Sequence, residues 1–325
     1  MKNKTLNILK AISAILIVFN HCKFPGTFGI LMSNYARIGV PIFFMISGYF
    51  VYNNDIEKIK KKIIHILRLL LISCIFWFLF NIIRYTLFEK NLLVPYLKNF
   101  ISLKNIVKFF IFNENFFWGH LWFINALLYC YLWQFLIKKF NIENYKYESY
   151  LVIILLIVYQ LMNAFVINEN LSNIYLIRNF IFVGIPFFDI GKLINHFKFE
   201  KYVKVKYSTF LVIFIIFTLE ILTYVNELYI CSIILSIYLF LFCLKEPNVE
   251  QKQLEYIGDK LNLYIYVLHP AIKYVIIYVY KGLNLSSNIL MYLQPIIVLI
   301  ITIMISYLYY NLVEKINNKK TVKTN

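Results

Sequence analysis

The sequence contains few of the residues that keep a soluble protein in water. Only 16 of its 325 residues are Asp or Glu, and charged residues make up 15% of the chain. Apolar residues make up 61%, whereas soluble domains hold about 45–50%. A soluble globule could not cover that much apolar surface. The composition therefore excludes an ordinary soluble enzyme and indicates that the bilayer is the solvent.

The five cysteines form no pattern of their own. They show no paired spacing and no adjacent set of metal ligands, so neither a disulfide framework nor a metal site is expected. Each falls in or at the end of an apolar run, at Cys22, Cys74, Cys130, Cys231 and Cys243. We expect free thiols that pack as small apolar residues.

Long hydrophobic runs recur along the chain, and each is long enough to cross about 30 Å of hydrocarbon as a helix. They fall near residues 6–22, 37–54, 63–83, 119–137, 150–168, 175–194, 208–225, 228–244, 260–280 and 289–313. The first run follows Lys2 and Lys4 as a signal peptide would, but no small-residue cleavage site follows it, so we expect it to be retained. The prediction is an all-α polytopic membrane bundle of about ten transmembrane helices.

The net charge of +17 would indicate nucleic acid in a soluble protein, but its distribution favours a different interpretation. Most lysines lie in segments that share one side of the membrane, such as KIKKK at 58–62 and KFEKYVKVK at 198–206. By the positive-inside rule these segments are cytoplasmic, as are both termini. We predict a multi-pass protein of the cell (plasma) membrane that binds the bilayer and no nucleic acid.

The domain organisation follows from the lack of hydrophilic segments. We predict a single transmembrane domain over residues 1–315 and a disordered basic cytoplasmic tail over 316–325. The longest gap between runs, about 84–118, is rich in apolar residues, which favours an interfacial or re-entrant segment. No internal repeat is evident, and this weakens a transporter assignment.

Ionisable residues within a span are costly and usually face a cavity or a partner. Lys10 and His21 in the first run are eleven residues apart, so they share a face of a helix and are separated by about 16 Å along its axis. Two interpretations remain open for them. They line a functional path, or Lys10 extends to the inner headgroups while His21 sits at the outer interface.

The second and third runs carry further candidates. Ser47 and Gly48 interrupt an apolar helix, which favours either close helix packing or a backbone opened toward a ligand. His65 and Arg68 lie one turn apart and follow a lysine run that includes Lys61 and Lys62. That cluster is suited to phosphate binding or to anchoring on anionic lipid.

Later segments add polar and aromatic residues near the outer face. His120 and Trp122 begin the fourth run, where an aromatic belt alone would account for the tryptophan. Arg178 starts the sixth run, with Asp189 three turns deeper. His269 stands mid-membrane directly before Pro270, which frees a backbone carbonyl and kinks the helix.

Taken in order, these segments resemble the acyltransferase-3 family of polytopic membrane O-acyltransferases, over nearly the whole chain. The matching pieces are Lys10-x10-His21, FFMISGYF at 43–50, HLWFINALL at 120–128, IPFFDIGKL at 185–193 and LYIYVLHP at 263–270. Two departures stand out. Lys10 replaces the usual arginine, which loses the bidentate fork, and His65-x-x-Arg68 stands where two arginines are common.

The resemblance implies an enzyme, an acyltransferase that transfers groups other than aminoacyl groups. It would move an acyl group, usually acetyl, from cytoplasmic acyl-CoA to a hydroxyl of a cell-surface or lipid-linked glycan. Acetyl-CoA or another acyl-CoA is then a donor substrate, and no cofactor is bound permanently. Partners are the donor, the glycan acceptor, the bilayer and proteins of a glycan-biosynthesis complex.

The resemblance also implies roles for the candidate residues. His21 and Lys10 are the expected catalytic residues, with His21 as the base and Lys10 beside the path of the donor. The expected donor-binding residues are His65, Arg68, Lys61 and Lys62, and the expected acceptor-binding or cavity residues are Ser47, His120, Trp122, Arg178 and His269. A non-enzymatic polysaccharide exporter or membrane carrier is the chief alternative, and succinyl or a longer acyl chain in place of acetyl is a third.

Overall fold

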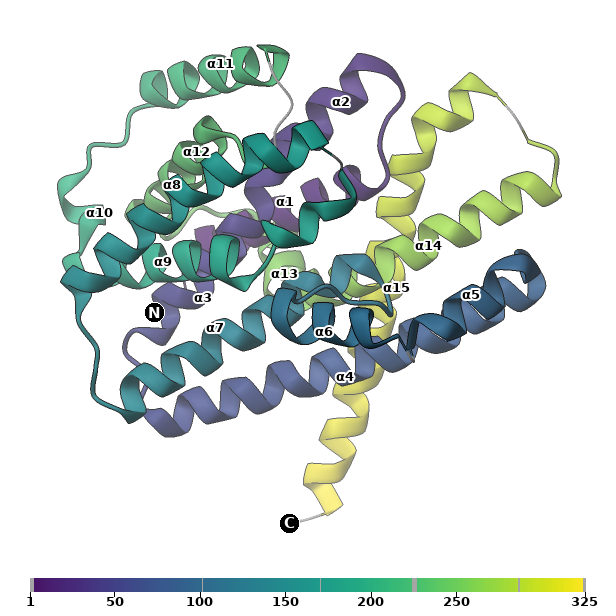
Figure 1. The fold of residues 1–325 in the computed structure, drawn as a ribbon, viewed down its shortest axis with the longest axis horizontal. Helices are drawn as coiled ribbons and strands as arrows, with labels where there is room; N and C mark the ends of the chain where they lie inside the picture. Colours follow the sequence, from purple (N-terminus) through teal and green to yellow (C-terminus); the bar gives the residue numbers. More distant parts are fainter. Residues whose placement is uncertain (1–2, 101, 170, 224–226, 286, 324–325) are drawn as a thin grey trace. The chain divides into compact units, whose positions relative to one another are not determined.

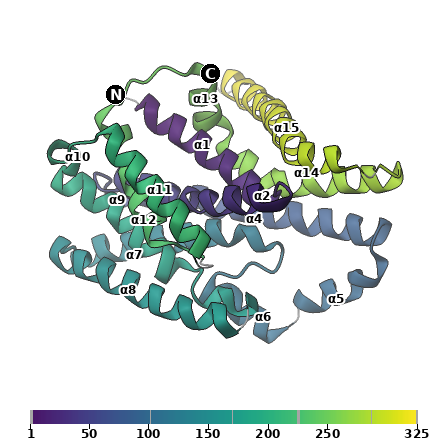
Figure 2. The same ribbon diagram turned by 90° about the horizontal axis from the view of Figure 1, so that it is seen from above.

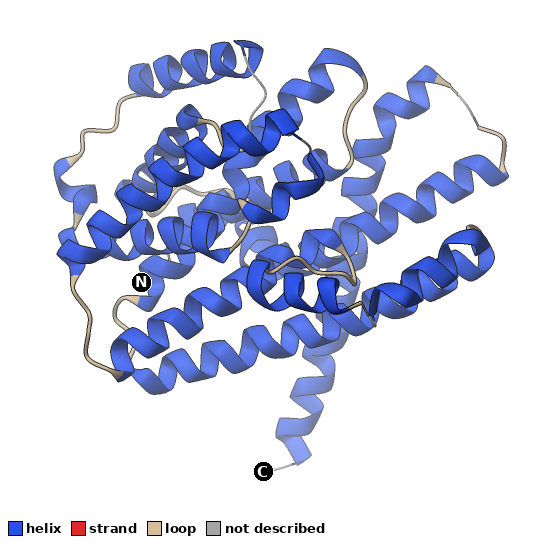
Figure 3. Cartoon of the chain, in the orientation of Figure 1, coloured by secondary structure: helices blue, strands red, loops and turns tan. Residues whose placement is uncertain are grey.

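The computed structural model describes residues 3–100, 102–169, 171–223, 227–285 and 287–323, and within them the chain forms helices joined by turns and loops without strands (Figure 3). The predicted all-α class is confirmed. The chain divides into two compact units. The first comprises Met1–Val40, Val205–Leu222 and Ile230–Asn325, and the second comprises Pro41–Lys204 and Thr223–Tyr229. The predicted single domain over 1–315 stays a prediction.

The first unit is organised around its first helix. Its helices are α1 (Lys4–His21), α2 (Gly26–Tyr35), the 3₁₀ turn η1 (Ala36–Ile38), α11 (Tyr207–Thr223), α12 (Ile230–Lys245), α13 (Lys252–Tyr256), the π-helix η5 (Ile257–Leu261), α14 (Asn262–Gly282) and α15 (Asn288–Lys323). Helix α1 packs against α2, α12, α14 and α15, and α15 also packs on α14 (Figure 2). The core of this unit therefore surrounds the helix that carries Lys10 and His21.

Local signals explain why α1 begins and where it packs. The side chain of Asn3 accepts a hydrogen bond of 2.8 Å from the backbone N–H of Leu6, which caps the helix. Residues such as Leu9 and Val18 are buried along its length. At Gly258 the backbone of η5 approaches so closely that a Cβ would lie 1.7 Å from the carbonyl oxygen of Asn7. Only glycine permits this contact between η5 and α1.

The second unit contains the remaining helices. They are α3 (Gly39–Val51), α4 (Ile56–Leu87), α5 (Lys90–Phe100), α6 (Leu103–Phe112), η2 (Gly119–Leu121), α7 (Trp122–Lys139), α8 (Tyr145–Glu169), η3 (Leu171–Leu176), the π-helix η4 (Phe180–Gly184), α9 (Ile185–Phe197) and α10 (Phe199–Tyr202). Helices α4 and α7 run side by side (Figure 1), and α8 packs on α9. Asp55 caps α4 by accepting from the Lys58 backbone N–H at 2.8 Å, and that hydrogen bond lowers the pKa of Asp55.

Seven helices within the described residues are long and apolar enough to cross a membrane. They span Gly26–Val51, Ile56–Leu87, Gly119–Lys139, Tyr145–Val166, Phe180–Phe197, Lys252–Gly282 and Asn288–Ile316. Three further predicted spans correspond to shorter or less apolar helices, namely α1 with 18 residues, α11 with 17 and α12 with 16. The apolar windows of α4, α8 and α15 are only 28%, 22% and 22% buried, which leaves apolar surface for lipid.

Two other segments were singled out by the sequence. The gap 84–118 forms the short helices α5 and α6, and α6 has no buried residue. Its sequence LKNIVKFFIF places lysines among exposed apolar residues such as Leu103 and Phe110, which is consistent with an interfacial segment. Helix α15 continues past the start of the expected tail as far as Lys323, while residues 324–325 lie outside the described residues.

Two glycines bring α3 and α9 into backbone contact. A Cβ on Gly48 would lie 1.8 Å from the carbonyl oxygen of Phe188, and a Cβ on Gly191 would lie 2.0 Å from that of Met45. Each helix thus presents a glycine to the backbone of the other. Of the two interpretations of Ser47 and Gly48, the structure shows close helix packing at Gly48.

The reciprocal glycine contact predicts a steric effect. The Cβ of Gly48→Ala would meet backbone that cannot move without shifting α9. We therefore expect the free energy of unfolding to fall by about 1–3 kcal/mol or more. The measurement is the thermal midpoint of the detergent-solubilised protein. Gly282→Ala is the matched control, because nothing lies within 4 Å of a Cβ at Gly282. Equal midpoints for the two variants would contradict the tight contact.

Candidate active site

Two histidines from distant parts of the sequence meet in the first unit. His21 is the last residue of α1, and His269 lies in α14 with 1% of its surface exposed. Their ring centroids are 5.1 Å apart, so the imidazoles are in contact. The Nδ1 atom of His269 lies 3.0 Å from the carbonyl oxygen of Ile265. Because a carbonyl only accepts, Nδ1 carries the proton, which leaves the Nε2 of neutral His269 as an acceptor.

A lysine that the sequence reasoning missed completes this end of α1. Lys273 donates a hydrogen bond of 2.7 Å to the backbone carbonyl of His21. That carbonyl belongs to the last turn of α1, where carbonyls lack helical partners and a positive charge is favourable. Lys273 stands four residues after His269 and therefore on the same face of α14. The four-residue spacing from His269 is the sequence signal by which Lys273 could have been identified as a site residue.

Lys10 lies on the same helix as His21 but at a different depth. Because α1 is continuous between them, the eleven-residue spacing separates the two residues by about 16 Å along the axis. The Lys10 ammonium donates to Oδ1 of Asn7 at 3.3 Å, one turn toward the N-terminus. The structure therefore pairs His21 with His269 and Lys273, while Lys10 lies in the N-terminal half of α1.

The predicted donor residues form an exposed stripe. Lys61, Lys62, His65 and Arg68 all have exposed side chains on α4. Positions 61, 65 and 68 follow the i, i+4, i+7 spacing, so they share one face of the helix. This arrangement is accessible both to a phosphate-bearing ligand and to lipid headgroups, and it leaves both interpretations open.

The remaining predicted residues lie in the second unit. The Ser47 hydroxyl donates to the carbonyl of Phe43 at 2.9 Å, one turn earlier in α3. The guanidinium carbon of Arg178 lies 5.6 Å from the centre of the Trp122 ring, within the range of a cation–π contact. His120 is buried and packs edge-on against Trp77, with ring centroids 5.2 Å apart. The structure thus brings Trp122 and Arg178 together.

A cluster of buried charges lies between α7, α8 and α9. The ammonium of Lys192 is 2.9 Å from Oε1 of Glu148 and 2.8 Å from Oε1 of Gln134. Oε1 of Glu143 and Oδ1 of Asp189 follow at 3.7 and 3.9 Å. The side chains of Lys192 and Asp189 are fully buried. One ammonium thus compensates three carboxylates inside an apolar bundle, where an uncompensated charge is costly.

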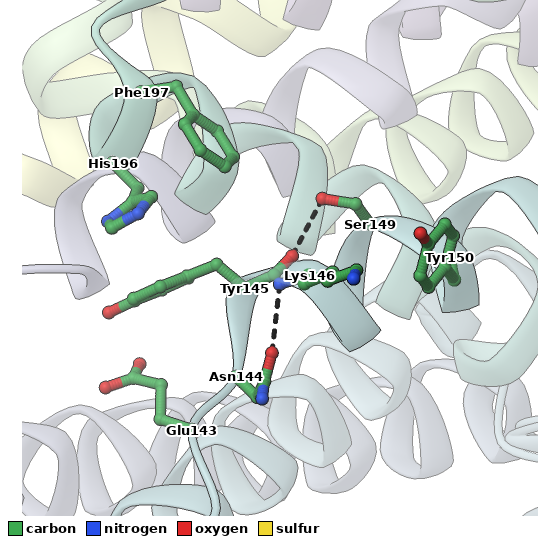
Figure 4. A pocket seen from close by; sticks show the side chains of 8 residues that line it. All are labelled: Glu143, Asn144, Tyr145, Lys146, Ser149, Tyr150, His196 and Phe197. Carbon is green, nitrogen blue, oxygen red and sulfur yellow. Dashed lines mark hydrogen bonds between the residues drawn. The ribbon is translucent and has the colours of Figure 1, made fainter.

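A pocket of about 600 Å³ opens at the Glu143 end of this cluster (Figure 4). Figure 4 shows the ring of Tyr145 between His196 and Glu143. The Tyr145 and His196 rings stack with centroids 3.7 Å apart, and the hydroxyl of Tyr52 lies 3.1 Å from Nδ1 of His196. These contacts join the start of α8 to the end of α9, and the Lys192 ammonium lies 5.9 Å from the centre of the Tyr145 ring.

The described residues contain no group of three or more His, Cys, Asp and Glu side chains that could hold a metal ion. All five cysteines are free thiols. Long apolar helices with polar side chains buried between them define a multi-pass membrane protein.

Comparison with known proteins sets the family. A family model described as an acyltransferase domain matches residues 3–311, so the chain belongs to the acyltransferase-3 family. The match confirms the family inferred from the sequence and supports an enzyme that transfers acyl groups. No curated protein and no solved structure matches the chain.

Proposed function

We propose that the protein is a membrane O-acetyltransferase that moves an acyl group from cytoplasmic acyl-CoA to a hydroxyl of a cell-surface or lipid-linked glycan. The observation that carries this proposal is the contact between His21 and His269, with ring centroids 5.1 Å apart in a chain of the acyltransferase-3 family. A paired imidazole inside a membrane bundle is suited to proton transfer.

The direction of transfer rests on topology. We propose ten spans, formed by the seven long helices together with α1, α11 and α12, in the cell (plasma) membrane. An even number of spans keeps both termini on one side, and the lysine distribution assigns that side to the cytoplasm. In this orientation Lys10 lies toward the cytoplasmic end of α1 and His21 toward the outer end, which separates the donor side from the acceptor side.

The proposed chemistry assigns His21 as the general base. It takes the proton of the acceptor hydroxyl while the hydroxyl oxygen attacks the thioester carbonyl carbon. The carbon–sulfur bond then breaks, and the departing CoA thiolate receives the proton from the imidazolium. His269 contacts the His21 ring, and its Nδ1–H···O bond to Ile265 keeps its own orientation constant. Each turnover is balanced in protons, with one ester formed for one thioester consumed.

Lys273 places a positive charge at the His21 end of α1. Its hydrogen bond to the His21 carbonyl holds the last turn of α1 in place. Acyl transfer passes through an oxyanion, and an ammonium in a water-poor site stabilises negative charge more strongly than it would in water. We propose that Lys273 positions His21 and contributes to this stabilisation, while Lys10 lies along the donor path.

We assign donor binding and acceptor binding to the residues that the sequence analysis predicted for each. Lys61, Lys62, His65 and Arg68 would bind the phosphates of CoA, which the exposure of all four side chains on α4 supports. We assign Trp122, Arg178, His120, Ser47 and His269 to the acceptor side as acceptor-binding or cavity residues. The donor is a substrate, and proteins of glycan biosynthesis are proposed partners.

The direct test is mass spectrometry of cell-envelope glycans from cells with and without the protein. We expect cells that express it to carry glycans heavier by the mass of an acetyl group, and cells that lack it to lose this modification. A mass difference corresponding to succinyl or a longer chain would keep the reaction and change the donor. Unmodified glycans in both cells, together with altered glycan export, would favour the carrier function instead.

A further inference from the structure

One face of α7 carries a stripe of side chains that faces the start of η4. Trp122, Asn125 and Tyr129 follow the i, i+3, i+7 spacing and share this face. The Trp122 ring contacts the guanidinium of Arg178, and the Tyr129 ring lies 5.1 Å from that of Phe180. Asn125 therefore lies between two residues that both contact the Arg178–Phe180 segment.

The amide of Asn125 is buried but makes no hydrogen bond with any residue that the structure describes. Its exposed fraction is 2%, and neither Nδ2 nor Oδ1 has a hydrogen-bond partner among the described residues. A primary amide can donate two hydrogen bonds and accept two. Leaving these groups unsatisfied in an apolar setting is unfavourable, so a buried free amide requires an explanation.

Another asparagine of the same region shows what a structural role looks like. Asn179 precedes η4, and its Oδ1 accepts from the backbone N–H groups of Ile181 and Phe182. Its Nδ2 donates to two backbone carbonyls, those of Tyr175 and Leu176. The amide of Asn179 is thus fully used in shaping the start of the π-helix. Asn125 has no such task in the fold.

We propose that Asn125 is a specificity-determining residue that hydrogen-bonds a hydroxyl group of the acceptor, next to the ring that stacks on Trp122. A hydroxyl donates one hydrogen bond and accepts others, as the amide does, so a single sugar hydroxyl can satisfy both atoms of Asn125. Trp122 offers an aromatic face to the apolar side of a sugar ring, and Arg178 offers further donors. The amide is neutral, which favours a neutral polyhydroxyl group over a charged one.

This inference rests on the proposed function, and it assigns the acceptor subsite to the α7–η4 face. A substrate-binding role of Asn125 can also be distinguished from a structural role in which its amide only binds a buried water. An isosteric apolar replacement removes an unsatisfied amide, so Asn125→Leu should leave the fold as stable as before or more so. The same change should weaken recognition of the acceptor, because its hydroxyl loses its partner on entering the site.

The experiment uses the full chain in nanodiscs with radiolabelled acetyl-CoA. The acceptor is cell-envelope glycan extracted from the organism that encodes the protein, which is called the host below. For Asn125→Leu we expect acetyl transfer at subsaturating glycan to fall roughly tenfold, a change the size of one hydrogen bond. We expect acetyl-CoA binding without glycan and the thermal midpoint to match the wild type. Asn125→Gln, which keeps the amide, should recover part of the transfer by comparison with Asn125→Leu.

The possible results separate this inference from the proposed function. Transfer by Asn125→Leu equal to the wild type would overturn the role of Asn125 and leave the acetyltransferase standing. A lower thermal midpoint with unchanged transfer per folded molecule would assign Asn125 to a structural water and also overturn it. A wild-type protein that neither binds acetyl-CoA nor acetylates glycan would overturn the proposed function itself, and this inference with it.

Discussion

Replacing His21 with alanine is expected to lower acetyl transfer by about 10²–10⁴-fold, the usual contribution of a general base. His21 ends α1, and its side chain is only half-buried, so the fold should tolerate the change. The measurement is the initial rate of transfer from radiolabelled acetyl-CoA to host glycan, with the protein in nanodiscs. Binding of acetyl-CoA should remain, because the proposed donor residues lie on α4.

The matched control is Asn20→Ala, one residue earlier in α1 and also half-buried. It should transfer acetyl groups at the wild-type rate and insert normally into the membrane. His269→Ala should show an intermediate rate if His269 acts through the ring of His21. A His21→Ala protein that transfers at the wild-type rate would remove His21 from the mechanism.

Removing the buried ammonium of Lys192 is expected to lower the stability of the protein more than any other substitution proposed above. In Lys192→Met, the carboxylates of Glu143, Glu148 and Asp189 lose their shared positive partner inside the bundle. Breaking a buried charge pair from one side costs about 3–5 kcal/mol, since the remaining charge stays uncompensated. The thermal midpoint of the solubilised protein should fall markedly, and less folded protein should accumulate in the membrane.

A control and a partial rescue make this prediction specific. Lys146→Met removes an exposed lysine of α8 and should leave the midpoint unchanged. Adding Asp189→Asn to Lys192→Met removes one of the like charges and should restore part of the stability. A Lys192→Met protein as stable as the Lys146→Met protein would show that the three carboxylates do not depend on Lys192.

The helical architecture was predictable from hydropathy because each span is a long run of consecutive apolar residues. Seven helices of the described residues are long and apolar enough to be spans, and the runs that overlap α11 and α12 form shorter helices. The observed helix boundaries differ from the predicted ones near the π-helices η4 and η5, which directly precede α9 and α14. Close backbone contacts such as that of Gly258 on Asn7 depend on which helices meet, and hydropathy does not specify that.

The candidate site was predictable only in part. His21 and His269 were singled out separately as ionisable groups in apolar runs, and the structure places them together. Lys273 lies inside α14 but belongs to none of the motifs singled out in the sequence, and its contact with His21 depends on where α1 ends. Glu143 and Glu148 fell in a connection between predicted spans, so no sequence pattern linked them to Lys192. Asn125 is neutral, and a search for charges passes over it.

The paired glycines of α3 and α9 limit how these two helices can move. Sliding one helix along the other would drive residues with side chains into the positions that Gly48 and Gly191 occupy, and both contacts would clash at once. Rotation about the point of crossing keeps each glycine opposite its carbonyl. The crossing therefore acts as a pivot, and any opening of α3 relative to α9 is a swing about that pivot in which the helix ends travel furthest.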